Sequence, residues 1–371
     1  LRLPLLSLEV FPQRTPPSAV IARERVVACD AGAAAGGVVA GMRLADAWAL
    51  HPALNVIERD PARELKQLEA LACWAGGLTS EVSLDASGAL LLEIAGSLRL
   101  FGGLPSLLGR IAREIAAQGH VACMALAPTP RAALWLAGHD PAGATENHRH
   151  ATQAEANEAL ARLPLAALEL PVEIAARLHG FGAYYLGDVL RLPRAGLSRR
   201  VGPAFVTLLA QALGELPDPR PRFVFPETFR ERLELPGRVE EASRLLFAAQ
   251  RLLLQLCGWL NARGSGILQC RLLLEHDGKP ASPLELSLSS ATRDVDRLGR
   301  VLRERLERLT LPAQVLALVL EADACEALPG RAAGLFGEAA SGEGVPQLIE
   351  RLQARLGDGE VAGAHQHQHA V

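Results

Sequence analysis

The stretch that decides the fold is residues 81–93, which read EVSLDASGALLLE. Polar and apolar residues alternate up to Asp85, a turn of small residues follows, and an apolar run resumes at Ala89. Alternation on both sides of a glycine-containing turn predicts a pair of strands, at 79–85 and 89–95. The turn therefore presents one carboxylate, Asp85, followed directly by Ala86.

Outward from this hairpin, helix and strand patterns alternate in both directions. Toward the start of the chain we expect a short strand at 1–10, an apolar segment at 18–28, and helices at 44–50 and 61–74. Toward the end we expect a helix at 103–117, a strand at 121–127 and a helix at 129–137. Alternation of this kind favours an α/β or α+β sheet domain.

Beyond a polar loop, the second half of the chain changes character twice. Residues 163–213 read as short helices interrupted by glycine and proline, and the proline-rich residues 214–226 read as an extended linker. A new unit then follows in the order βαββαβ, which predicts an independent small domain. Its expected strands and helices are 228–235, 239–262, 266–275, 283–289, 291–309 and 313–321. A helix is also expected at 346–356.

Composition excludes several classes of protein. The formal net charge is −3, so any nucleic-acid binding must come from local patches. The 6 cysteines include no C-x-x-C pair, which argues against a zinc ribbon or a redox motif. No apolar run is long enough to span a bilayer and no signal peptide is visible, so we expect a cytoplasmic protein without a membrane partner. Because the sequence begins with Leu rather than Met, we expect a piece of a longer chain.

Five short segments occur in one order over the first part of the chain. They read LPLLSLE at 3–9, GMRLA at 41–45, VSLD at 82–85, SLRLFGG at 97–103 and LAPTP at 126–130. With these segments, and with the order of the units above, the chain resembles the Y-family (translesion) DNA polymerases. Within that family it is most similar to the ImuB-type polymerase-like proteins.

The resemblance implies an α+β multidomain fold with palm, fingers, thumb and little finger in that order. The helical residues take the place of the thumb, and the βαββαβ unit takes the place of the little finger. The limits that we expect are a palm- and fingers-like domain at 1–162 with a fingers-like insert at about 11–75, a helical thumb-like domain at 163–213, a proline-rich linker at 214–226, a little-finger-like domain at 227–325, and a tail with a short helix at 326–371.

The first departure from the family pattern concerns its metal site. Two-metal nucleotidyl transfer needs divalent ions roughly 3.5–4 Å apart, held by several carboxylates. Ala86 stands where the family has an acid after Asp85, and the first strand, residues 1–4, has no acid. The resemblance thus implies that no metal and no other cofactor is bound. Asp85 is then either a solvated residue at a strand end or a vestigial ligand of one Mg²⁺.

The second departure concerns the site of the incoming nucleotide. The family holds the triphosphate with a Tyr and an Arg in the fingers and with a Lys after the Ala-Pro motif. By alignment these positions fall on Ala31, Ala34 and Leu134. Alanine and leucine offer a phosphate neither charge nor a side-chain donor. The metal carboxylates and the triphosphate contacts are both missing, and together these departures imply that polymerase activity is absent.

One candidate DNA contact lies in the thumb-like residues. Arg199 and Arg200 precede Gly202 and a proline at a helix start, where backbone amides can meet a phosphate. The resemblance implies two helix-hairpin-helix elements, of which this is the second and residues 169–172 form a degraded first. The alternative interpretation is a tight connection between helices with solvated arginines.

A second candidate DNA contact lies on the predicted helix at 291–309. Arg293, Arg297 and Arg300 follow i, i+4, i+7 spacing, which places them on one face of a helix. Acidic residues between them offset much of the charge, so a salt-bridged surface helix is the alternative. If the arginines do touch phosphates, binding should be weak, salt-sensitive and independent of sequence.

Two features of the polar and glycine-rich segments remain. Leu335 and Phe336 resemble the Leu-Phe end of the peptide by which translesion polymerases dock on the sliding clamp, although Ala332 replaces the usual Gln. The alternative is a pair that covers the edge of the last domain. The histidines at 139, 148 and 150 have no acid or cysteine spaced for a shared metal, so we expect a plain surface loop there.

Three hypotheses of function follow. The first is a non-catalytic adaptor that brings a separate error-prone, replicative-type polymerase to damaged DNA during induced (SOS) mutagenesis. Its other partners, a sliding clamp and a recombinase-like accessory protein, are implied by the resemblance. The second is an active, divergent Y-family polymerase, which needs a compensating acid such as Glu81 or Glu93 near Asp85. The third is a protein scaffold that does not bind DNA.

Overall fold

The computed structural model describes residues 1–139 and 149–328. The chain divides into two compact units, each built from separate segments. The first unit comprises Leu1–Ser7, Val82–Glu93 and Phe101–Phe223, and the second comprises Leu8–Glu81, Ile94–Leu100 and Val224–Val371. The domain limits expected from the sequence remain a prediction. The Leu335–Phe336 pair, His148 and the expected helix at 346–356 lie outside the described residues.

The first unit begins with the hairpin that decides the fold. Strands β4 (Val82–Asp85) and β5 (Ala89–Leu92) pair antiparallel, with Asp85 opposite Ala89. Gly88 closes the turn with φ +76°, a conformation that costs glycine little. Helix α5 (Leu104–Ala117) buries Leu107, Ile111 and Ile115, which are spaced four residues apart on one face. Helix α6 (Pro130–Ala137) follows, capped by the Thr129 side chain.

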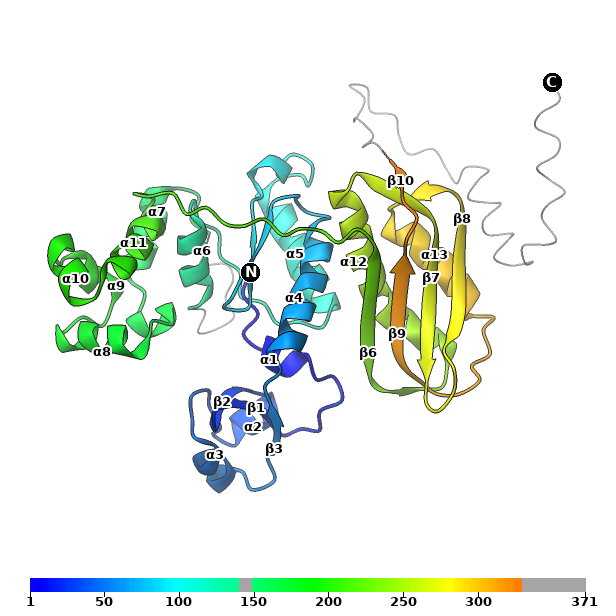
Figure 1. Ribbon diagram of the computed structural model, residues 1–371, viewed down its shortest axis with the longest axis horizontal. Helices are drawn as coiled ribbons and strands as arrows, with labels where there is room; N and C mark the ends of the chain where they lie inside the picture. The colour runs from blue at the N-terminus through cyan, green and yellow to red at the C-terminus, as the bar shows by residue number, and fades with distance from the viewer. Residues whose placement is uncertain (140–148, 329–371) are drawn as a thin grey trace. The chain divides into compact units, whose positions relative to one another are not determined.

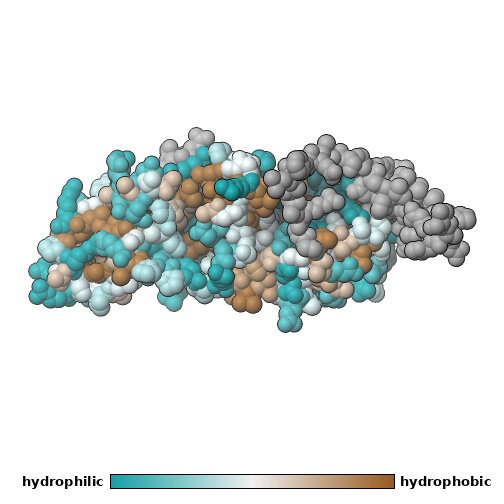
Figure 2. Space-filling view, turned by 90° about the horizontal axis from the view of Figure 1, so that it is seen from above, coloured by the Kyte–Doolittle hydropathy of each residue, from teal (hydrophilic) through white to brown (hydrophobic). Residues whose placement is uncertain are grey.

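Five further helices complete the first unit (Figure 1). They are α7 (Gln153–Ala161), α8 (Val172–Gly180), α9 (Leu186–Leu190), α10 (Arg194–Arg200) and α11 (Pro203–Ala212). Each is short, because glycine or proline follows within a few residues, and all share one apolar core with α6 that includes Leu160, Leu186 and Phe205. Hydrophobic residues also reach the surface among hydrophilic ones over these helices (Figure 2).

The second unit contains a small sheet near the start of the chain. Strand β1 (Ser18–Ala22) lies between β2 (Arg25–Cys29), to which it is antiparallel, and β3 (Asn55–Glu58), to which it is parallel. Helices α2 (Ala31–Ala35) and α3 (Leu44–Leu50) pack against it, and α4 (Pro61–Ala75) follows.

The βαββαβ order predicted for the last domain is confirmed. Its elements are β6 (Phe229–Val239), α12 (Leu245–Ala262), β7 (Ser265–His276), β8 (Ser282–Thr292), α13 (Val295–Leu306) and β9 (Val315–Ala322), followed by a short β10 (Glu326–Ala327). The antiparallel sheet has the order β10-β7-β9-β6, with β8 also paired to β7. Helices α12 and α13 cover one face of it (Figure 1). Helices and sheets together confirm the predicted α+β class.

Helices α4 and α12 of the second unit approach each other closely. A Cβ on Gly258 of α12 would lie 2.3 Å from the Cys73 carbonyl oxygen and 2.4 Å from that of Trp74. A Cβ on Gly76, just after α4, would lie 2.7 Å from the Gly258 carbonyl oxygen. Only glycine allows the two backbones to come this near, so this crossing depends on two residues without side chains.

Two expected strands are absent from the described residues. The strand expected at 1–10 is wrong, because Leu6–Glu9 form a short helix, α1. The strand expected at 121–127 is also wrong, since only single bridges form there, from Cys123 to Arg2 and from Leu126 to Arg149. Pro4 explains both errors: it has no N–H to donate, so the segment that would have paired with 121–127 turns into a helix after one bridge.

Candidate functional site

Asp85 lies at the end of β4, where three donors surround its carboxylate. Oδ1 accepts hydrogen bonds from the Ser87 backbone N–H at 3.0 Å and from the Ser87 hydroxyl at 2.7 Å. Oδ2 accepts one from Nη1 of Arg220 at 2.9 Å. The side chains of Asp85 and Arg220 are only 17% and 16% exposed. The carboxylate is therefore half-buried and neutralised by a cation from the chain itself.

Arg220 comes from the proline-rich segment, which lies along β4. Its Nη2 donates to Asp218 at 2.8 Å, and the Asp218 side chain is 5% exposed. Three residues later, the Phe223 N–H donates to the Val82 carbonyl oxygen at 2.7 Å. The segment expected to be an extended linker is thus hydrogen-bonded to β4 at both ends of this strand.

The local charges keep Asp85 ionised. Burial acts to raise its pKa, but the hydrogen bonds from Ser87 and the positive charges of Arg220 and Arg131 outweigh burial and lower the pKa below its usual range. Arg131, in the first turn of α6, has a lowered pKa because of burial and the nearby charge of Arg220, which two acids, Asp218 and Asp85, partly offset. The group consists of two carboxylates and two guanidiniums.

This donor set does not fit the metal pair of the polymerases. Within residues 1–139 and 149–328, no three His, Cys, Asp or Glu side chains lie together as metal ligands. Glu93 follows Leu92, which pairs with Val82, three residues along the strand from Asp85. At roughly 3.3 Å per residue, that separation exceeds about 10 Å, too far to share an ion with Asp85. A divalent cation would also have to displace Arg220.

The positions expected for triphosphate contacts carry apolar side chains in the structure as well. Ala31 and Ala34 lie on the exposed side of α2, whose start is capped by Asp30. Leu134 is buried in α6 at 7% exposure. None of these three side chains carries a hydrogen-bond donor, so none can bind a phosphate.

Arg199 and Arg200 occupy the last turn of α10, ahead of Gly202. Gly202 has φ +115°, and Pro203 begins α11 directly after it. The Arg200 guanidinium lies over the Phe181 ring, 5.3 Å from its centroid, and Nε of Arg199 donates to the Ala195 carbonyl oxygen at 3.3 Å. Neither arginine forms an ion pair within the part of the chain that the structure describes.

The arginines near α13 do not share one helical face. Asp294 caps the helix through hydrogen bonds from Asp296 and Arg297, so Arg293 lies before it, and Nη1 of Arg293 donates to the Leu328 carbonyl oxygen at 3.0 Å. Only Arg297 and Arg300 belong to α13. The expected common face is thus wrong for Arg293, since the cap residue starts the helix after it.

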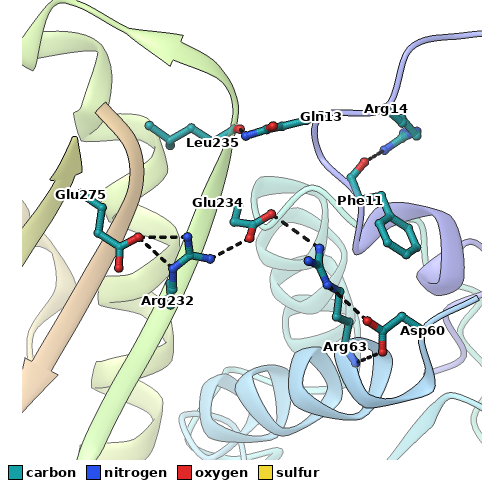
Figure 3. A network of polar contacts seen from close by, with 9 residues as sticks. All are labelled: Phe11, Gln13, Arg14, Asp60, Arg63, Arg232, Glu234, Leu235 and Glu275. Carbon is teal, nitrogen blue, oxygen red and sulfur yellow. Dashed lines mark hydrogen bonds and ion pairs between the residues drawn. The ribbon is translucent and has the colours of Figure 1, made fainter. Parts of the chain in front are cut away.

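The second unit holds a charge network that the sequence analysis missed (Figure 3). Arg63 of α4 bridges Asp60 at 3.3 Å and Glu234 of β6 at 3.7 Å, and Arg232 bridges Glu234 at 2.7 Å and Glu275 of β7 at 2.9 Å. Beside it lies a hollow of about 490 Å³ whose lining includes Phe11 and Arg14. The alternating charges of residues 230–234 were the sequence signal for this network. They do not identify its other members, because those lie far away along the chain.

The class of the chain follows from its family match. Residues 10–137 match the impB/mucB/samB family. Two curated relatives, one from each of two strains of Caulobacter vibrioides, are both called Protein ImuB. Each is 32% identical to this chain over 334 residues, which span 88% of this chain and 70% of the relative. The chain therefore belongs to the ImuB family, and the resemblance stated from the sequence is confirmed.

Solved structures similar to this chain are polymerases by name. A DinB family error-prone DNA polymerase from Sulfolobus solfataricus is 17% identical, with a TM-score of 0.47, over 87% of this chain and 97% of that one. An insertion ternary complex of Dbh DNA polymerase is 15% identical, with a TM-score of 0.47, over 86% and 96%. Among the described residues, no helix of this chain is long and apolar enough to cross a membrane.

Proposed function

We propose that this chain is a non-catalytic, polymerase-like adaptor in translesion synthesis. The observation that carries the proposal is the state of Asp85, whose carboxylate is matched by Ser87 and by the Arg220 guanidinium. Nucleotidyl transfer depends on positioned metal ions that neutralise the reacting phosphates. A carboxylate that already has an internal counterion, with Ala86 beside it and Glu93 out of reach, is not equipped to hold such ions.

The adaptor role joins several weak contacts. The family relationship supports damaged DNA, a sliding clamp, a separate error-prone replicative-type polymerase and a recombinase-like accessory protein as partners. Leu335 and Phe336 are our candidates for the clamp contact, and Arg199, Arg200 and Gly202 for a DNA contact, together with Arg293, Arg297 and Arg300. Contacts that are weak alone act together through avidity when they share one chain.

A primer-extension assay tests the loss of chemistry. The purified chain is given a primer, a template and all four nucleotides, with Mg²⁺ and separately with Mn²⁺, beside an active polymerase as positive control. We expect no extension with either ion. Extension that disappears in Asp85→Ala would mean a working metal site, and the chain would then be an active, divergent polymerase.

A binding titration tests the adaptor role itself. We expect the chain to bind DNA in filter binding with an affinity that falls as salt rises, because phosphate contacts release counterions. Absence of binding at low salt would favour a scaffold that does not bind DNA. Clamp binding is compared between the wild type and a Leu335→Ala/Phe336→Ala variant of equal stability. Equal binding by both would remove these two residues from the proposal.

A further inference from the structure

The hairpin between α8 and α9 exposes an unusual number of aromatic side chains. Tyr184 is 62% exposed, Tyr185 is 53% exposed and Phe181 is 39% exposed. The chain contains 2 tyrosines, and both of them lie on this hairpin. Clustered exposed rings of this size mark a binding surface more often than a single exposed residue does.

A hollow of about 600 Å³ opens beside these rings. The rings of His179 and Tyr184 are stacked, with centroids 5.5 Å apart and an angle of 26° between their planes. The residues that line the hollow are Pro164, Ala166, His179, Tyr184, Tyr185 and Asp188. Its size and flat aromatic walls suit one planar ring of a ligand.

The backbone holds this hollow in shape. The Leu165 N–H donates to the Tyr184 carbonyl oxygen at 2.9 Å, which ties the hairpin to the segment before α8. Oδ2 of Asp188 accepts from the N–H groups of Tyr184 and Tyr185 at 3.1 and 3.0 Å. The tyrosine rings are thus carried by a backbone fixed on both sides, so little conformational entropy remains to be lost when a ligand binds.

The charges around the hairpin favour an anionic partner. Arg177, Arg199 and Arg200 form no ion pair within the described residues, and Nη1 of Arg177 donates to the Arg200 carbonyl oxygen at 3.2 Å. The acid in the hollow, Asp188, has its charge met by two backbone N–H groups and by Arg191 at 3.3 Å. Glu173 lies in the first turn of α8, away from the hairpin end of that helix.

We propose that this hollow binds an unstacked base of single-stranded nucleic acid, with the neighbouring arginines on its phosphates. Aromatic side chains stack on any base, and guanidiniums beside them follow the backbone of a single strand. A protein partner with apolar side chains would use the same rings but would gain nothing from the three arginines, whereas a single strand of nucleic acid uses both. The inference rests on the proposed adaptor role, because it names the form of DNA that this part of the chain contacts.

Fluorine NMR of the full chain labelled with fluorotyrosine reads this site alone, because both labels lie in it. The probe is a single-stranded oligothymidylate of about 12 nucleotides. Two matched probes are an abasic strand of equal length, which keeps the phosphates without bases, and the corresponding duplex. We expect both tyrosine signals to shift with oligothymidylate and to stay in place with the abasic strand and the duplex.

Affinity measurements on variants complete the test. Tyr184→Ala/Tyr185→Ala should weaken binding of oligothymidylate by about tenfold or more, and Tyr184→Phe/Tyr185→Phe should restore most of it, since stacking needs the ring and not the hydroxyl. Phe247→Ala, which removes an aromatic ring 66% exposed on α12, is the control and should change nothing.

The possible failures are distinguishable. Oligothymidylate that binds without moving either tyrosine signal, or that binds the double alanine variant equally well, overturns the hollow and leaves the adaptor role standing. Equal shifts with the abasic strand would also overturn it, because they would show a response to phosphate alone. If none of the three probes bound the chain, both the hollow and the DNA contact of the proposed function would be contradicted.

Discussion

At the scale of single residues, the partner of Asp85 determines what its carboxylate can do. A carboxylate shared between metal ions stays available to them, whereas this one accepts from Ser87 and from Arg220. The same guanidinium also neutralises Asp218, which is nearly excluded from water. Arg220 therefore has a structural role that can be measured without any assay of function.

Replacing Arg220 with alanine should destabilise the first unit. The variant Arg220→Ala removes the hydrogen-bonded cation from Asp85, which is half-buried, and from Asp218, which is almost fully buried, and loss of hydrogen bonds to charged groups costs about 1.5–3 kcal/mol. The control is Arg113→Ala, on an exposed position of α5, which should change the free energy of unfolding by less than about 0.5 kcal/mol. Urea unfolding of both variants measures the difference. Equal midpoints for the two would show that the Asp85 pair contributes nothing.

Glu231 of β6 makes stability depend on pH in the second unit. Burial raises its pKa to about 7, opposed by Lys66 and aided by the negative charge of Glu69. Because the ordinary value is about 4.3, the folded chain binds more protons than the unfolded chain between these values. This contribution to stability is therefore complete below about pH 4 and is lost as pH rises through about 7.

The variant Glu231→Gln should remove that pH dependence. We expect the wild type to lose on the order of 2 kcal/mol between about pH 5 and pH 8 relative to the glutamine variant. Thermal and urea unfolding at the two values measure this, with the exposed Glu227→Gln as control. A pH profile that is the same in Glu231→Gln and in the wild type would contradict the assignment to Glu231.

At the scale of elements, the close packing of α4 against α12 depends on glycine residues at the contact. Gly258 brings its backbone against the carbonyl oxygens of Cys73 and Trp74, which no other residue would permit. The charge network of Figure 3 lies between the same helix, α4, and β6 of the same unit. The glycine contact joins α4 to α12, and the ion pairs join α4 to β6, so both connect α4 to the last domain.

A matched pair of glycine variants isolates this contact. Gly258→Ala forces a Cβ to within 2.3 Å of a carbonyl oxygen, so the helices must separate, at a cost of about 1–3 kcal/mol. Gly299→Ala, inside α13 with nothing within 4 Å of its Cβ, should stabilise by about 0.5–1 kcal/mol. Opposite shifts in unfolding free energy are expected. Stabilisation by both substitutions would mean that α4 and α12 do not pack this closely.

Local pattern predicted the elements whose partners are close in sequence. The β4–β5 hairpin, the helix expected at 103–117 and the βαββαβ order were all predicted from local pattern. The pattern failed at 121–127, because Val121 and its neighbours needed a partner strand that Pro4 cuts short. Strand β3 was missed because four residues next to a proline-bounded turn carry too little alternation to identify.

The candidate site was predictable only in part, for the same reason. Asp85 was singled out by its place in the hairpin, but Arg220 lies 135 residues further along the chain, and periodicity carries no information about such a pair. The sequence pattern indicates only short helices interrupted by glycine and proline over residues 163–213, which does not distinguish the turn that carries the two tyrosines. Two adjacent tyrosines in a chain with no others were the signal that could have identified it.

At the scale of the whole molecule, the formal net charge is only −3, and many positive side chains are also paired with nearby acids. The sheet of the last domain pairs its arginines across strands: Arg230 with Glu321, Arg232 with Glu275, and Arg271 with Glu285. Paired guanidiniums release few counterions on meeting DNA. Arg199 and Arg200 of the helical part, by contrast, form no ion pair among the described residues, so their charges are available to phosphates.

The salt dependence of DNA binding should follow this division. For single strands the slope of log affinity against log salt is about −0.7 per phosphate contact, so Arg199→Gln/Arg200→Gln should reduce its magnitude by about 1.4. The control Arg271→Gln removes a paired arginine of the sheet and should leave the slope within error. Titrations with one oligonucleotide at several salt concentrations give the slopes. A larger change in the control than in the double variant would place the DNA contact on the sheet.

The pairing of Asp85 with Arg220 has a consequence for any attempt to build an ion site at the end of β4. An acid placed at position 86 would not be sufficient, since the arginine still competes for Asp85. Removing the arginine alone leaves Asp218 without this counterion and should weaken the fold. The two changes depend on each other, so we expect that no single substitution creates an ion site there.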